Sequence, residues 1–174
     1  MSNTLYSAAL TAFAKGEIVW KASGGSTVKA IIVDTAKYTF SDAHTNLSQV
    51  PAAARVGTPV PLTLVDAASG GVCDAADITF TGLTNAPTVE AIVIYKDTGT
   101  ENTSTLIAYI DTGTGLPTPA GVNSIAVSWD NGANKIFKLL EPDMAAHQIT
   151  INPLSGGIGT APAGVVPHAS DCGA

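Results

Sequence analysis

Short apolar segments separated by turn-forming residues constrain the fold of this chain more than any other feature. Apolar and polar residues alternate in several of them, as at Val60, Leu62 and Leu64, and this period of two is typical of a strand with one face in water. The segments 89–95 and 106–110 are more continuously apolar, as central strands buried on both faces are. The pattern predicts a mainly β fold, an antiparallel β-sandwich or barrel of about seven or eight strands. An α/β fold is disfavoured because no helical segment separates the strands.

The same signals place further strands and one long loop. The turn at 130–132 contains Asn-Gly, which favours positive φ and predicts a hairpin between 125–129 and 136–139. Residues 36–57 have no sustained period, so we expect a long loop with one helical turn, and loops of this length often provide a binding surface. The other predicted strands span residues 17–20, 28–33, 60–64 and 76–82.

The first sixteen residues predict the one helix of the chain. Asn3 can cap it, and Gly16 stands where a left-handed C-cap belongs. We expect its narrow apolar face to lie on a sheet of its own subunit, or alternatively in a groove on a neighbour. That face contains Leu5, Ala8, Ala9, Ala12 and Phe13.

The C-terminal segment 141–174 differs from the segments before it, since it is rich in Gly, Pro and Ala. Such a sequence cannot bury enough apolar surface on itself to offset the entropy of ordering it. We therefore predict a β-sandwich domain with an N-terminal helix at 1–140. Residues 141–174 are either mobile or, as their aliphatic residues favour, an extended arm that becomes ordered on another chain. The predicted contacts of the arm are its large aliphatic residues, Ile149, Ile151, Leu154, Ile158, Val165 and Val166.

Charged residues make up only 13% of the chain, whereas about a quarter is usual. Disorder is not predicted, because 45% of the residues are hydrophobic, and the apolar runs are far shorter than the ~20 residues of a membrane span. The net charge of -6 and the scattered basic residues argue against a nucleic-acid partner. The N-terminal residues have no basic region before an apolar run, so we expect no Sec export. A surface of Thr, Ser, Asn, Ala and Gly is easily buried against a neighbour, which favours an assembly subunit.

Two cysteines, Cys73 and Cys172, are too few for a disulfide scaffold. One interpretation is two unpaired thiols in a reducing cytoplasm. The alternative is a late disulfide between subunits, because Cys172 lies close to the C-terminus.

The tripeptide Asp-Thr-Gly occurs twice, at 97–99 and 111–113. Aspartic proteases use this tripeptide on two loops, so that two carboxylates share one proton and activate water. Here the two copies follow neighbouring strands of one predicted hairpin, which places Asp97 and Asp111 a strand length apart, on the order of 20 Å. We therefore expect turns, in which Asp accepts backbone N–H bonds and Gly has positive φ. A dimeric protease that uses one copy is the remaining enzymatic alternative.

Other chemical signals are weak. His44, His147 and His168 have no ligand at helical or hairpin spacing, so no metal site is predicted. No segment has the pattern of a phosphate loop or a nucleophile elbow, and the sequence predicts neither an enzyme nor a cofactor. Trp20 and Trp129 are interpreted as core anchors, or alternatively as a sugar-binding face together with the 36–57 loop.

Several ordered motifs together resemble a family of small virion structural proteins of tailed bacteriophages. They are Gly16 to Trp20, Lys29 to Tyr38, Val50 to Val56, Asp77 to Phe80, Glu90 to Gly99, Leu106 to Thr112, Gly115 to Pro117 and Trp129 to Gly132. The resemblance implies a capsid-associated or neck- and tail-associated β protein of the virion, and it implies no catalytic residue.

The resemblance and the composition predict the same class of function. We expect a non-enzymatic virion structural protein, either a capsid decoration or cement protein or a neck-associated subunit, assembled in the cytoplasm of the host bacterium. Its expected partners are copies of itself, the major capsid protein, and neck or tail proteins. The alternatives are a tail or fibre-attachment component, or a receptor- or carbohydrate-binding module on the particle.

Overall fold

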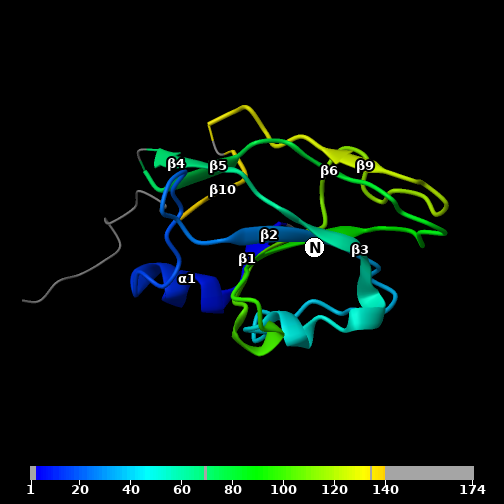
Figure 1. The fold of residues 1–174 in the computed structure, drawn as a ribbon, viewed down its shortest axis with the longest axis horizontal. Helices are drawn as coiled ribbons and strands as arrows, with labels where there is room; N and C mark the ends of the chain where they lie inside the picture. Colours follow the sequence, from blue (N-terminus) through cyan, green and yellow to red (C-terminus); the bar gives the residue numbers. More distant parts are fainter. Residues whose placement is uncertain (1–2, 69, 134, 140–174) are drawn as a thin grey trace, which may run out of the picture. The chain divides into compact units, whose positions relative to one another are not determined.

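The computed structural model describes residues 3–68, 70–133 and 135–139, and this part of the chain is mainly β (Figure 1). It contains ten strands, more than the seven or eight expected, and a single α-helix. All strand pairs are antiparallel. In chain order the elements are β1 (Thr4–Leu5), α1 (Ser7–Ala14), β2 (Val28–Val33), η1 (Leu47–Gln49), η2 (Ala52–Ala54), β3 (Arg55–Pro61), β4 (Leu64–Ala68), β5 (Val72–Ala75), β6 (Ile78–Phe80), β7 (Ala91–Lys96), η3 (Glu101–Thr103), β8 (Leu106–Ile110), β9 (Ile125–Val127) and β10 (Phe137–Lys138).

A five-stranded sheet with the order β1-β8-β7-β2-β3 is the centre of the fold. Successive residues of a strand point to opposite faces, and both faces of β2 and β7 are buried. The prediction of central strands with two buried faces is therefore confirmed for β7 and β8, and the strand predicted at 28–33 is β2.

One face of this sheet carries the larger core cluster, which includes Ala30 and Ile32 of β2 together with Ile92 and Ile94 of β7. Two small sheets add to the same cluster, one with the order β10-β5-β4 and one that pairs β6 with β9. In Figure 1 these small sheets form a layer beside the five-stranded sheet.

The other face is covered by the segment between β2 and β3, which contains η1 and η2 and was predicted to be a long loop with one helical turn. Tyr6, Tyr38 and Leu47 pack there against Ile31 and Val93. The hydroxyl groups of Tyr6 and Tyr38 are 2.9 Å apart, and burial together with this hydrogen bond raises the pKa of Tyr6. This segment thus forms part of the core, and its apolar residues are not free to form an exposed binding surface.

The helix begins later than predicted, because Thr4–Leu5 pairs with β8 and the helix begins at Ser7. Asn3 is not its cap: the Asn3 amide oxygen accepts hydrogen bonds from the N–H groups of Asp111 (3.1 Å) and Thr112 (3.0 Å). The predicted C-terminus is confirmed. Gly16 has φ +71° and its N–H donates to the carbonyl of Phe13, as in a Schellman cap.

Three further strand predictions are wrong. Residues 17–20 are not a strand, and the predicted strand 60–64 is divided between β3 and β4. The predicted hairpin between 125–129 and 136–139 does not form, because β9 pairs with β6 and β10 pairs with β5. The strand β5 was not predicted at all. The partners of β9 and β10 are distant in sequence, and local turn chemistry does not reveal them, whereas β5 pairs with the preceding strand β4.

Two predictions concern regions beyond the described residues. The arm 141–174, with Ile149, Ile151, Leu154, Ile158, Val165, Val166 and Cys172, lies outside them, as does the predicted boundary at 140. Across the described ranges, no helix has both the length and the apolar character that crossing a membrane requires.

Candidate functional site

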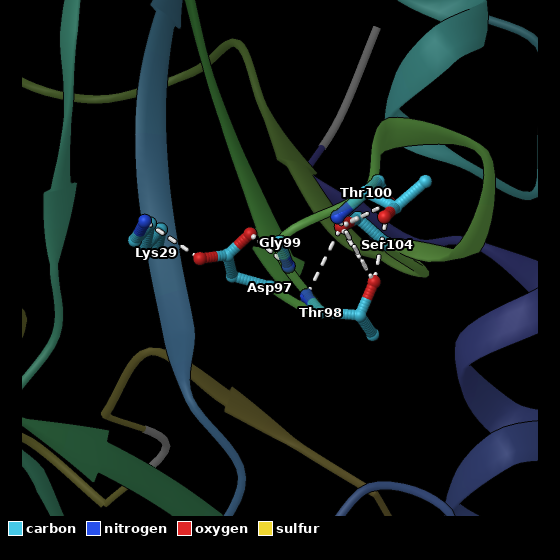
Figure 2. A network of polar contacts seen from close by, with 6 residues as sticks. All are labelled: Lys29, Asp97, Thr98, Gly99, Thr100 and Ser104. Carbon is cyan, nitrogen blue, oxygen red and sulfur yellow. Dashed lines mark hydrogen bonds and ion pairs between the residues drawn. The ribbon is translucent and has the colours of Figure 1, made fainter.

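The first Asp-Thr-Gly tripeptide forms the turn after β7 (Figure 2). The Asp97 carboxylate accepts a hydrogen bond from the N–H of Gly99 at 3.2 Å, and Gly99 has φ +80°. The other carboxylate oxygen of Asp97 lies 2.6 Å from the ammonium nitrogen of Lys29 on β2. The Thr98 N–H donates to the hydroxyl of Ser104, a side chain that is buried. The prediction of turn chemistry is therefore confirmed at this copy.

The two aspartates are far apart. In the hairpin of β7 and β8, Tyr95 pairs with Leu106 and Ile92 pairs with Ile110, so Asp97 and Asp111 follow opposite ends, roughly 20 Å apart along the strands. The hydrogen bond and charge of Lys29 and the bond from Gly99 lower the pKa of Asp97, against a smaller opposing effect of burial. A carboxylate paired with lysine in this way cannot share a proton with a second carboxylate.

The second copy differs from the prediction in one respect, because Gly113 does not have a positive φ. The backbone of Asp111 and Thr112 is bound instead by the side chain of Asn3, 109 residues away from Thr112. This contact joins the end of β8 to the start of the chain, and it replaces the glycine turn that the local sequence suggests.

The turn after β7 is also tied to the covering segment by Arg55. Its guanidinium group lies against the Glu101 carboxylate, at 2.9 Å for one nitrogen–oxygen pair. The same side chain donates to the backbone carbonyls of Val50 and Leu47, each at 2.9 Å. Only 13% of the Arg55 side chain is exposed. Arg55 therefore has a structural role that the sequence did not indicate.

Both tryptophans are buried and anchored. The indole N–H of Trp20 donates to the carbonyl of Asp74 at 2.8 Å, and that of Trp129 donates to the carbonyl of Ala76 at 3.1 Å. Both belong to the larger core cluster, as does Val56, whereas Tyr38, Leu47, Val50 and Ala54 of the 36–57 segment belong to the cluster on the opposite face of the central sheet. The structure therefore does not bring Trp20 or Trp129 together with that segment as one sugar-binding face.

The Cys73 thiol is completely buried in the larger cluster. It is a free thiol within the described part of the chain, and desolvation raises its pKa to about 12. A disulfide from Cys73 to another subunit would require this side chain to leave the core.

A cleft with a volume of about 500 Å³ lies between β9 and the end of β8 in the described residues. Its apolar lining comes from both layers, with Ile32 and Ile92 of the central sheet and Val127 of β9. Polar groups, including Asp130 and Lys135, line the rest. The cleft therefore offers an apolar surface with polar groups beside it, the usual composition of a binding site.

A second feature of the cleft is the strand beside it. β9 pairs with β6 on one side and has no partner strand on its other side in the described residues. Consecutive residues Ile125, Ala126, Val127 and Ser128 all line the cleft. An unpaired strand edge can add a further strand through backbone hydrogen bonds.

Among the residues that the structure describes, no group of three His, Cys, Asp or Glu side chains could hold a metal ion. His44 instead forms a hydrogen bond with the Tyr38 hydroxyl at 2.9 Å. His147 and His168 lie outside the described residues.

No protein-family model matches this chain, and no curated protein matches its sequence. The family that the ordered motifs resemble therefore stays a prediction.

Proposed function

We propose that this protein is a non-enzymatic structural subunit of a tailed-bacteriophage virion, either a capsid decoration or cement protein or a neck-associated subunit. It packs in many copies against itself and against other virion proteins such as the major capsid protein. The observation that carries this proposal is the cleft, with Ile32, Ile92 and Val127 in its lining, beside the unpaired edge of β9. A surface of this kind is suited to another protein chain.

The surroundings of Asp97 and Cys73 support a structural role rather than a catalytic one. Asp97 binds Lys29 and the turn backbone, and the buried thiol of Cys73 has a raised pKa, which disfavours the nucleophilic thiolate. These contacts support a structural role for the described residues.

The low charge of the chain supports repeated packing. With 13% charged residues, few ions must lose their hydration when a neighbouring subunit covers the surface, so desolvation opposes assembly weakly. Many copies on one particle also make weak individual contacts sufficient. We propose further that the central sheet and the two small sheets form the two layers of a β-sandwich.

A complementation experiment tests this function. Phage particles are prepared from a genome that lacks the gene, and purified protein is added and sedimented with them. We expect saturable binding in many copies per particle, and we expect the variants Asp97→Asn and Asp111→Asn to restore the phage as the parent protein does. Loss of complementation in a folded Asp→Asn variant that still binds particles would instead indicate catalysis. Absence of binding to any particle would contradict the proposed function.

A further inference from the structure

The cleft lies where strand edges of two sheets come close together. On one side is β9, consecutive residues of which line the cleft and which has one unpaired edge in the described residues, and on the other is the end of β8, with Ile110 and Thr112, beside Asn3. The opposite margin of the central sheet is different, because β3 at that margin contacts β6 of the second layer. At the β8 margin of the central sheet, beside β9, apolar cleft residues and the unpaired backbone edge of β9 therefore lie together.

The side chains of β9 show how an added strand would be oriented. Ile125 and Val127 are partly buried and pack on the core, whereas Ala126 between them is exposed. An added strand would place alternate residues on the same two sides. Its apolar residues would enter the cleft, and the residue between them would lie beside Ala126 in solvent.

The segment 147–151 has the sequence that such a site requires. In His147-Gln148-Ile149-Thr150-Ile151 two isoleucines alternate with polar residues, and no Asp, Glu, Lys or Arg is present. Five residues form a strand of about 17 Å, longer than the three residues of β9. Alternation of this kind gives one apolar side for the cleft and one polar side for water.

The direction of β10 favours a segment from another copy. The N–H of Leu139 donates to the carbonyl of Gly71, beyond one end of β5, whereas β9 pairs with Ile78–Phe80. From Ile136, which lines the cleft, the chain thus runs toward Gly71 and away from β9 until its described part ends at Leu139. Residues 140–146 would have to reverse this direction before residues 147–151 could reach the cleft of their own subunit.

We propose that the cleft binds residues 147–151 of a second copy of this chain as an added strand on β9, with Ile149 and Ile151 in the cleft. This inference deepens the proposed function, because it names the self-association site on which repeated packing would depend. The backbone hydrogen bonds supply the pairing, and the two isoleucines supply the apolar contact.

Two double variants of the full-length chain test the contact by analytical ultracentrifugation over a range of concentrations. The variant Ile149→Asp/Ile151→Asp should raise the dissociation constant for self-association at least tenfold. The matched control Ala161→Asp/Ala163→Asp introduces the same charge at the same spacing elsewhere in the arm, at residues that are not among its predicted contacts, and should leave this dissociation constant unchanged. Equal losses in both variants would contradict a specific strand, and a parent protein that is monomeric at every concentration would overturn the inference.

Cysteine cross-linking tests the register and the source of the strand. In a Cys172→Ser background, one tagged chain carries Ala126→Cys and a second, differently tagged chain carries Thr150→Cys. Opposed residues on neighbouring strands have Cβ atoms about 5 Å apart, so we expect a disulfide between the two tags. A chain that carries both cysteines and forms only an intramolecular disulfide would overturn the second copy as the source.

The proposed function and the inference can fail separately. If the Ile149→Asp/Ile151→Asp variant enters particles in the same copy number as the parent, the strand contact is wrong and the virion role stands. If the parent self-associates through this contact and yet binds no particle, the virion role is wrong and the contact stands.

Discussion

Replacing Arg55 with alanine provides a sharp test of how the covering segment is held on the central sheet. Arg55 begins β3, and its guanidinium group reaches the carbonyls of Val50 and Leu47 and the carboxylate of Glu101. The variant Arg55→Ala removes all of these contacts at once. Since the side chain is only 13% exposed, water replaces them incompletely.

The magnitude follows from the individual contacts. A hydrogen bond from a charged donor contributes about 1.5–3 kcal/mol, but the Leu47 carbonyl also accepts a bond from Val50 N–H and therefore retains a partner. The Glu101 side chain is 56% exposed, so solvent screens this ion pair and it adds well under about 1 kcal/mol. We expect Arg55→Ala to lower the free energy of unfolding by about 2–4 kcal/mol, mostly through the two carbonyls.

Urea unfolding of three variants separates these contributions. For a slope of about 2 kcal/mol/M, Arg55→Ala should shift the midpoint by roughly 1–2 M. Glu101→Ala should shift the urea midpoint by only a few tenths of the Arg55→Ala shift. Arg55→Lys should give a midpoint between those of the other two variants, because lysine lacks the planar guanidinium group that donates several hydrogen bonds at once. A Glu101→Ala variant as unstable as Arg55→Ala would refute the reasoning, because the exposed ion pair would then be the main contact.

Three single residues give further predictions. Gly16→Ala should lower the free energy of unfolding by about 1 kcal/mol, because Gly16 has φ +71°, which an alanine rarely adopts. Gly113→Ala is the control: both glycines have open space around them, but Gly113 has no positive φ, so the change in the free energy of unfolding should be less than ~0.5 kcal/mol. Equal shifts of the melting temperature in the two variants would contradict the cap at Gly16. In the Cys172→Ser variant, the buried Cys73 thiol, with its pKa raised to about 12, should not react with Ellman's reagent at pH 8 while the protein is folded, and it should react fully in urea. Rapid labelling of the folded protein would contradict the burial of Cys73. Folding lowers the pKa of Asp97, so the Asp97 carboxylate stabilises the fold above the pKa that it has in the unfolded state, and this stabilisation is lost as the pH falls. In Asp97→Asn the free energy of unfolding should therefore decline less steeply below about pH 5. A decline as steep as that of the parent protein would contradict the ion pair with Lys29.

The sequence predicted the central strands because their patterns are local. The β-branched run 28–33 and the apolar run 106–110 correspond to β2 and β8 with the same bounds. These strands are buried by neighbours on both faces, and nearly every residue in them must be apolar. Because nearly every residue of such a strand is apolar, the strand can be predicted without knowing which strand it pairs with.

The errors arose where a distant partner determines the structure. Asn3 has the composition of a helix cap, but in the folded chain it binds Thr112. The turn at 130–132 favours a hairpin, yet β9 and β10 each pair with a strand about 50 residues or more earlier in the chain. Turn preferences contribute little free energy beside the burial of a strand in the core, so the tertiary pairing prevails.

The cleft could not be predicted for the same reason. Its lining comes from segments that are adjacent only after folding, such as Ile32, Ile92 and Val127. The sequence did indicate an arm with aliphatic residues, which remains a prediction, but it gave no position where such an arm could bind. The unpaired edge of β9 becomes visible only once the strand order is known.

The copy number of this protein in purified virions tests the central claim most directly. Particles of the phage that encodes the chain are purified by density gradient, and the protein is quantified by mass spectrometry with isotope-labelled peptides against the major capsid protein. The account predicts a fixed ratio that corresponds to many copies per particle and persists after a high-salt wash. Absence of the protein from washed particles, with abundant protein in the infected-cell lysate, would contradict it.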